Sequence, residues 1–271
     1  MPAWRESLKR PDGPIETWLA TVAARLLSGV RLVAGGERHR LVEVEAYYHH
    51  PTDHPDPFAH RDPIQLNPAL WYFHKTRGVY RSGSFKGVDL TFGDGTAHGG
   101  MLLRGLEKED GSLVDGPSLL VDHLLAKTDK RDVLTLDLAI SGREAGDPDS
   151  PLHLEEINEP PRPTFLSTRV GLSLRRTKPT EPNVHFLLRP YRYLTEPGRT
   201  AKGKVYLVLS VIKQGLSDEE IRKATNCPAG TVRRYREDFE EGRTQPQDLA
   251  TYGGVELGTS DLCRLHGYAA K

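Results

Sequence analysis

The chain has 271 residues, and its 37 lysines and arginines balance its 37 aspartates and glutamates, so the formal net charge is zero. This balance excludes a protein that is basic overall, so any surface for nucleic acid has to be local. The two cysteines, Cys227 and Cys263, are too few for a disulfide framework or a cysteine-built zinc site, and we expect a reducing cytoplasmic setting, nucleoid-associated in a bacterium, with the nucleus left open.

The N-terminal half predicts one helix followed by strands. The opening segment, MPAWRESLKRPDGP, has no apolar run, so we expect no signal peptide, and no later run is long enough for a membrane span. Apolar residues recur at helical spacing over residues 15–28, and Gly29 suits the end of that helix. The next segment predicts a hairpin of two strands around residues 35–36. Residues 78–106 predict further short strands broken by glycine.

The middle of the chain predicts a helix, a long loop and late strands. A helix is expected over residues 118–125, behind a Gly-Pro pair that suits its first turn. Residues 141–163 are polar and proline-rich, which favours a loop, and residues 169–174 and 183–194 are interpreted as strands. Helices and strands do not alternate regularly, so the pattern indicates an α+β fold rather than a doubly wound sheet.

The last quarter of the chain predicts a group of short helices. Residues 203–215 form an apolar run compatible with a helix. Ser217 and Glu220 have the spacing of a capping box, which predicts the start of a second helix. A turn at residues 226–228 and a helix over residues 229–241 follow. Two short helices joined by a tight turn form a helix-turn-helix pattern.

We therefore expect two parts, a domain over residues 1–198 and a helical module over residues 199–271. The first half of the last predicted helix is where a recognition helix contacts DNA. The residues there that we expect to bind DNA are Thr231, Arg233, Arg234 and Arg236. The alternative is a plain helical hairpin, whose arginines are solvated and balanced by acidic residues of the same helix.

The segment LVEVEAYYHHPTDHPDPFAHRD, residues 41–62, concentrates the candidate chemistry. Glu43 and Glu45 are two residues apart on a predicted strand, so they share one face. One carboxylate there could activate water beside a tyrosine that stacks on a base; an exposed strand face is the plain alternative. The histidines of the segment lack HExxH spacing, and the prolines preclude a regular helix, so we expect no metal. These histidines are His49, His50, His54 and His60.

Several motifs, in chain order, carry a resemblance to a known family. EVEAY is followed by FAH, MLLRGLE, DGPSLL, RVG and FLLRP, within residues 15–195. This ordered set resembles the alkyladenine (3-methyladenine) DNA glycosylase family. The resemblance implies a single compact domain around a curved, mainly antiparallel sheet, to which the helical module is an addition. It also implies a monomeric, cofactor-free enzyme that extrudes an alkylated purine nucleotide from double-stranded DNA and hydrolyses its N-glycosidic bond, leaving an abasic site.

The resemblance assigns roles to individual residues. Glu45 matches the glutamate that acts as general base for the attacking water and stabilises positive charge developing on the sugar. Arg104 matches an arginine near that water and the DNA backbone. Tyr47 and His60 match the two side chains that hold the extruded base between them. Tyr80 fits a tyrosine that lines the same pocket.

The chain departs from the family pattern at three places. The spacer between Tyr47 and His60 is longer than expected. The wedge that fills the gap left by the extruded base falls on Phe85 or Ser82, and only an aromatic or apolar side chain can hold the gap open. Asp89 stands where the family pattern has an asparagine, which puts a like charge near Glu45 if both line one pocket; this would either raise the pKa of a carboxylate or mark altered specificity.

Three rival functions stay open at this point. The chain could be a catalytically altered glycosylase-like protein that binds DNA as a damage sensor or regulator through the helix-turn-helix. It could hydrolyse the N-glycosidic bond of another nucleic-acid substrate, such as a free nucleotide or an RNA base. The third rival is a metal-dependent hydrolase built on the histidine loop, and a chelator would abolish its activity.

Overall fold

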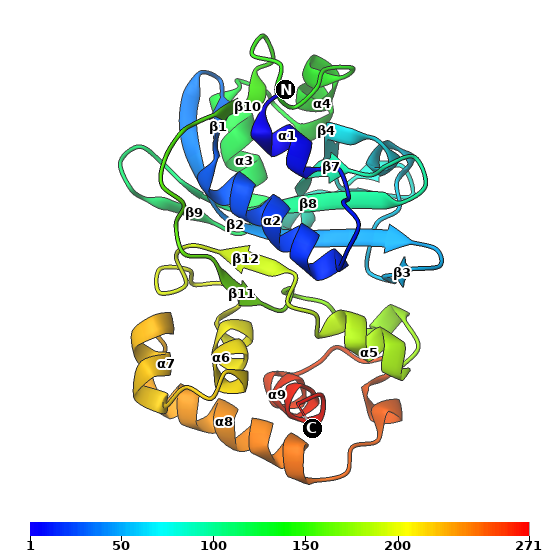
Figure 1. Ribbon diagram of the computed structural model, residues 1–271, viewed down its shortest axis with the longest axis vertical. Coiled ribbons are helices and arrows are strands. Elements are labelled where there is room, and N and C mark those ends of the chain that lie inside the picture. The colour runs from blue at the N-terminus through cyan, green and yellow to red at the C-terminus, as the bar shows by residue number, and fades with distance from the viewer. Residues whose placement is uncertain (271) are drawn as a thin grey trace. The chain divides into compact units, whose positions relative to one another are not determined.

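The computed structural model describes residues 1–270, which divide into two compact units (Figure 1). The first unit comprises Met1–Pro55, Ala59–Thr164 and Tyr193–Thr195. The second comprises Asp56–Phe58, Phe165–Arg192 and the residues from Glu196 onward. Each unit has its own architecture and is described by itself.

The first unit is built on an antiparallel sheet with the strand order β10-β1-β2-β8-β7-β4. The bounds of these strands are β1 Val30–Ala34, β2 Glu37–His50, β4 Pro68–Phe73, β7 Val88–Phe92, β8 His98–Glu107 and β10 Leu152–Glu156. The short strands are β3 His54–Pro55, β5 Lys75–Thr76, β6 Val79–Tyr80 and β9 Leu113–Asp115. The predicted hairpin is confirmed, because β1 and β2 join through Gly35 and Gly36, which both have positive φ, as a tight two-residue turn requires.

Two helices contact strand β2 of this sheet. Helix α2 (Ile15–Ser28) ends at Gly29 as predicted, and its Trp18 packs edge-on against Tyr48 of β2. Helix α3 (Pro117–Lys127) extends the predicted helix by a few residues, and its His123 contacts His39 of β2. Helices α1 (Ala3–Ser7) and α4 (Val133–Ile140) complete the first unit.

The predicted loop and late strands differ from the structure. The stretch 141–163, predicted as loop, contains β10, whose five residues all pair with β1. Only Leu152 and Leu154 of this strand are apolar, too few for the sequence pattern to indicate a strand. The stretch 169–174 is not a strand, and the stretch 183–194 begins in helix α5 (Glu181–Leu187) and ends in the short strand β12 (Arg192–Leu194). Helix α5 forms because Pro182 suits a first turn and the residues that follow have helical spacing.

Helices dominate the second unit. Beyond α5 they are α6 Lys204–Lys213, α7 Asp218–Thr225, α8 Ala229–Thr244 and α9 Thr259–Tyr268. The predicted capping box is confirmed, because the Ser217 hydroxyl accepts from the Glu220 amide and the Glu220 carboxylate accepts from the Ser217 amide. Apolar side chains from all four helices, including Leu209, Ile221 and Val232, share one core. Within residues 1–270, no helix has the length and apolar character needed to cross a membrane.

The α+β class predicted from the sequence is confirmed, and the boundary between the compact units lies near residue 164 rather than 198. The reason is a second apolar cluster that joins the segment after residue 164 to the C-terminal helices. Leu174 and the α5 residues Val184 and Leu187 pack there with Tyr252 and Leu265. Apolar contacts across many residues of sequence, rather than chain order, therefore define the second unit.

Candidate active site

Strand β2 presents a row of polar side chains to one face of the sheet. Glu43, Glu45 and Tyr47 alternate with apolar residues that point to the opposite face, beneath α2. Both glutamates are buried. The pairing of β2 with β8 is irregular next to Glu43, and such irregularities re-aim side chains beside functional sites.

Arg104 of β8 joins these carboxylates. Its Nε donates to Glu43 Oε1 at 2.6 Å and lies 3.3 Å from Glu45 Oε1. The Tyr47 hydroxyl donates to Glu45 Oε2 at 2.9 Å. Burial opposes the charge on Arg104, but Glu45 and Glu43 outweigh it and raise the pKa of the guanidinium. Two buried carboxylates are tolerated side by side because one guanidinium lies between them.

A transverse row of the sheet connects Glu45 to more polar groups. Antiparallel partners share a face, so a row of paired residues presents its side chains on one side. From β2 to β4 this row is Glu45, Leu102, Asp89 and Tyr72. Glu45 and Asp89 are two strands apart, so their backbones are about 10 Å from each other.

A glycine in the next row allows neighbouring side chains to lie close to the sheet. Gly100 of β8 pairs with Tyr47 on one side and Thr91 on the other. A Cβ at Gly100 would lie 2.5 Å from Asp89 Oδ2 and 2.5 Å from Gln65 Nε2, closer than real contacts allow. The side chains of Asp89 and Gln65 therefore occupy the space above Gly100, and they can lie this close to the sheet because residue 100 has no side chain.

His60 belongs to the Asp89 end of the row. Its Nδ1 shares a hydrogen bond with the Tyr72 hydroxyl at 3.0 Å, and its ring centroid lies 4.2 Å from that of His74. Burial, helped by the charge of His74, lowers the pKa of His60 to about 4. The imidazole is therefore neutral at neutral pH and offers an uncharged flat ring.

Three residues of this cluster, Gln65, Tyr72 and His74, were not anticipated from the sequence. Asp89 accepts from Gln65 Nε2 at 3.0 Å and from His74 Nε2 at 2.7 Å, and Tyr72 holds His60. The alternation of Tyr72 and His74 along LWYFH was the available signal, because it places both side chains on one face of a strand. Which face that is depends on the partner strand, which the sequence does not reveal.

The predicted pocket tyrosine, Tyr80, has a different set of contacts. Its hydroxyl donates to Asp137 of α4, and Lys75 Nζ lies 4.6 Å from the centre of its ring. The described contacts of Tyr80 are thus with α4 and the β5–β6 hairpin, and not with Glu45, Tyr47 or His60.

The wedge candidates lie on a short turn. Phe85 closes the turn η2 (Gly83–Phe85) and is 71% exposed, while Ser82 precedes the turn. Ser118 of α3 donates to the Gly83 carbonyl at 2.6 Å, and Lys86 forms an ion pair with Asp122 of the same helix. These two contacts hold the turn against α3.

The histidines of the loop after β2 have separate partners. His54 shares a hydrogen bond with the Tyr48 carbonyl at 2.8 Å, and His49 lies beside His98. His50 Nδ1 accepts from the Asp53 amide at 3.2 Å. Across residues 1–270, no three histidine, cysteine, aspartate or glutamate side chains are grouped as a metal site.

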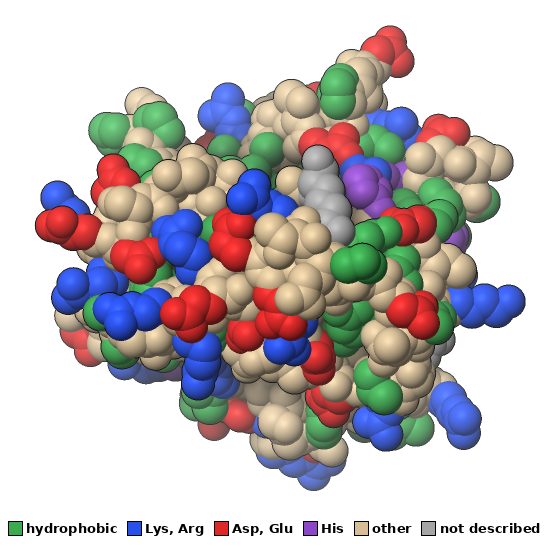
Figure 2. Space-filling view, turned by 90° about the horizontal axis from the view of Figure 1, so that it is seen from below, with side chains coloured by type: hydrophobic (Ala, Val, Ile, Leu, Met, Phe, Trp, Pro, Cys, Tyr) green, Lys and Arg blue, Asp and Glu red, His purple; other side chains and the backbone are tan. Residues whose placement is uncertain are grey.

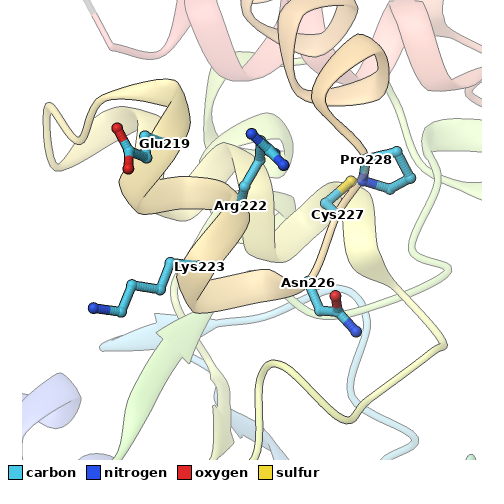
Figure 3. Close-up of a pocket in the computed structure, with 6 residues that line it drawn as sticks. All are labelled: Glu219, Arg222, Lys223, Asn226, Cys227 and Pro228. Atoms are coloured by element: carbon cyan, nitrogen blue, oxygen red, sulfur yellow. The ribbon is translucent and has the colours of Figure 1, made fainter.

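Some of the predicted helix-turn-helix residues are exposed, and one, Arg236, forms hydrogen bonds within the second unit. Arg233 and Arg234 are exposed on the first half of α8, and Thr231 is half-buried. Arg236 donates to Asp218 Oδ1 at 2.7 Å and to the Leu216 carbonyl at 2.6 Å, so it ties α8 to the start of α7. A cavity of about 490 Å³ lies at the turn between the helices (Figure 3). Its lining residues are Glu219, Arg222, Lys223, Asn226, Cys227 and Pro228.

Comparisons with known proteins identify two relatives. The uncharacterized protein L759 of Acanthamoeba polyphaga mimivirus is 34% identical over 125 residues, which cover 41% of this chain and 57% of that protein. A protein of Nocardia farcinica described as "Putative 3-methyladenine DNA glycosylase" is 35% identical over 175 residues, which cover 58% of this chain and 79% of that protein. No family model matches the chain. Through the shared sequence that spans most of the Nocardia protein, the chain belongs to the 3-methyladenine DNA glycosylase family.

Proposed function

We propose that the protein is a monofunctional DNA glycosylase that releases alkylated purines from double-stranded DNA. The observation that carries the proposal is the group of Glu45, Arg104 and Tyr47, linked by contacts of 2.6 to 3.3 Å to one another or through Glu43. This group shares one sheet face with Asp89, and Tyr72, which holds His60, ends the same row. A carboxylate beside flat side chains is what hydrolysis of an extruded nucleotide needs.

The proposed reaction uses water and no covalent enzyme intermediate. Glu45 accepts a proton from a water molecule whose oxygen forms a bond to C1′ of the sugar. The bond from C1′ to the base nitrogen breaks, and its electron pair leaves with the base, so a cationic alkylated purine departs neutral. Positive charge developing on the sugar is stabilised by the Glu45 carboxylate, while Arg104 offsets the charge of the two glutamates. The product is an abasic site.

Tyr47 and His60 would hold the extruded base between them. The Tyr47 hydroxyl is tethered to Glu45 and His60 to Tyr72, so both rings are restrained before the substrate arrives. Restraint of this kind lowers the entropy lost on binding.

Release of the free base is the direct test. A duplex carrying one alkylated adenine is incubated with the protein, and the liberated base is quantified by mass spectrometry. Binding of this duplex without any base release would favour the sensor alternative. Release confined to single strands, RNA or free nucleosides would favour the other hydrolase, and loss of release on adding a chelator would favour the metal-dependent one.

Phe85→Ala is expected to weaken base extrusion. An inserted ring offsets the few kcal/mol of unstacking that extrusion costs, so its loss should raise the half-saturating protein concentration in single-turnover release about tenfold or more. The matched control is Leu138→Ala on α4, which removes another apolar side chain that is 67% exposed. If the two variants behave alike, Phe85 is not the wedge.

The α7–α8 segment supports an additional proposal, a second contact with duplex DNA. Arg233 and Arg234 stand exposed where a recognition helix approaches DNA, and side chains of both signs are interspersed on the face seen in Figure 2, so the contact would be local. Replacing both by alanine should lower duplex affinity. It should also make the slope of log binding constant against log salt concentration shallower by the amount expected for about two phosphate contacts. The control pair, Arg131→Ala and Arg143→Ala, removes the same charge from the first unit; an equal effect would contradict the proposal.

A further inference from the structure

Asp89 is a buried carboxylate whose partners leave its charge uncompensated by a lysine or arginine. Its Oδ1 accepts from His74 Nε2 at 2.7 Å and its Oδ2 from Gln65 Nε2 at 3.0 Å. Among the described residues, His74 is the one basic side chain within ion-pair distance of Asp89. A carboxylate buried without a strong cationic partner is costly to fold, so it points to something that the folded protein does with it.

The same sheet face is rich in negative charge. The formally charged side chains that are buried in the first unit, among the residues described, are Glu43, Glu45, Asp89 and Arg104. These are three carboxylates and one guanidinium, and the pairing of strands puts all four on one face. Arg104 contacts Glu43 and Glu45, whereas Asp89 contacts His74 and Gln65.

The position of Asp89 makes its charge available to a ligand in the proposed site. It lies in the row of Glu45, two strands away, and its Oδ2 lies over Gly100 beside Gln65 Nε2, in the strand position that pairs with Tyr47. A planar base beside Tyr47 would therefore have an edge near the Asp89 carboxylate.

We propose that Asp89 selects damaged purines that carry a positive charge, over neutral damaged bases. This inference rests on the proposed glycosylase function. Alkylation at a ring nitrogen such as N3 or N7 leaves a purine nucleoside with a positive charge spread over the ring, whereas deaminated or bridged purines are neutral. A cationic ring supplies a charge opposite to that of Asp89, which has no lysine or arginine partner, and the attraction is strong in a site shielded from water.

The selection acts on capture of the base and not on the bond-breaking step. As the glycosidic bond breaks, its electron pair moves onto the base and the positive charge leaves the ring. The attraction to Asp89 is therefore greatest before the transition state, which improves binding without raising the maximal rate. The expected signature is a change in the half-saturating concentration, separate from the rate at saturation.

The test compares Asp89→Asn with the wild-type chain in single-turnover release from duplexes. One set carries cationic 7-methylguanine or 3-methyladenine, and the other carries neutral hypoxanthine. Relative to the half-saturating concentration for hypoxanthine, Asp89→Asn should raise that for the cationic bases about tenfold, the size of one partly shielded charge contact. Asp110→Asn, which removes one charge from an exposed turn, should change neither and serves as control.

A disturbed fold would affect the release of both kinds of base alike. The diagnostic quantity is therefore the half-saturating concentration for the cationic bases divided by that for hypoxanthine. An unchanged ratio in Asp89→Asn overturns the inference, as does a wild-type preference for hypoxanthine. If no base is released from any duplex, the glycosylase proposal fails, and binding then decides the inference separately. Duplexes with 7-methylguanine on a 2′-fluorinated sugar, which resists base loss, should bind more tightly than hypoxanthine duplexes, and Asp89→Asn should abolish this preference. Equal binding by the wild type overturns the inference.

Discussion

Replacing Glu45 with glutamine should slow release of an alkylated adenine from duplex DNA by about a hundredfold or more, the usual contribution of a general base. Glutamine keeps the shape of the side chain and can still accept from the Tyr47 hydroxyl, but it cannot take a proton from water. The measurement is single-turnover base release at saturating protein, which reports the bond-breaking step and excludes changes in DNA affinity.

The control for this variant is Glu37→Gln, an exposed glutamate at the start of β2 that pairs with Lys127. It should release base at the wild-type rate. Because Glu45 is buried beside Arg104, the variant also needs a thermal unfolding curve and a duplex-binding measurement to show that it is folded. Equal release by wild type and a folded Glu45→Gln variant would contradict both the role of Glu45 and the proposed mechanism.

The second large effect is expected on stability, at a buried ion pair of the second unit. Arg169 and Asp56 have no exposed side-chain surface, and Arg169 Nη1 lies 2.6 Å from Asp56 Oδ2. Arg169 also donates to the Phe186 carbonyl and lies over the rings of Phe58 and Tyr191. Asp56→Asn leaves the guanidinium buried without its counter-charge, so the free energy of unfolding should fall by about 3–5 kcal/mol. Denaturant unfolding monitored by circular dichroism measures the change.

A neighbouring aspartate offers a matched control. Asp53, in the same loop, forms an exposed ion pair with Arg10 at 3.7 Å, and Asp53→Asn should change stability by less than about 1 kcal/mol. Combining Asp56→Leu with Arg169→Met removes both charges, so the double variant should lose less stability than the two single changes added together. Strict additivity would show that Arg169 and Asp56 do not depend on each other.

Local patterns were sufficient for much of the fold. The helix ending at Gly29, the hairpin at residues 35–36 and the capping box at Ser217 each depend on neighbouring residues, and each is confirmed. The strand β10 and helix α5 were missed for the converse reason. Their short segments carry weak patterns, and partners distant in the chain stabilise them.

The candidate site shows the same division more sharply. The resemblance carried by the order of motifs proposed Glu45, Tyr47, His60 and Arg104 as site residues. The alternation along β2 added only that Glu43 and Glu45 share one face. The sequence did not predict the residues that contact the site residues. Gln65 and His74 around Asp89, and Tyr72 behind His60, depend on the register between β4, β7 and β8 and on the loop that crosses them.

Register and loop path are settled by long-range packing, which a single sequence does not display. The residue types and spacings of this chain therefore determined its family resemblance, its α+β class and its candidate base-activating glutamate. Only the tertiary structure decided that Asp89 is buried on the same face as Glu45 and that Tyr80 turns to α4. The physical reason is that pairing between distant strands, and burial against distant helices, select the environment of each polar side chain after its local conformation is set.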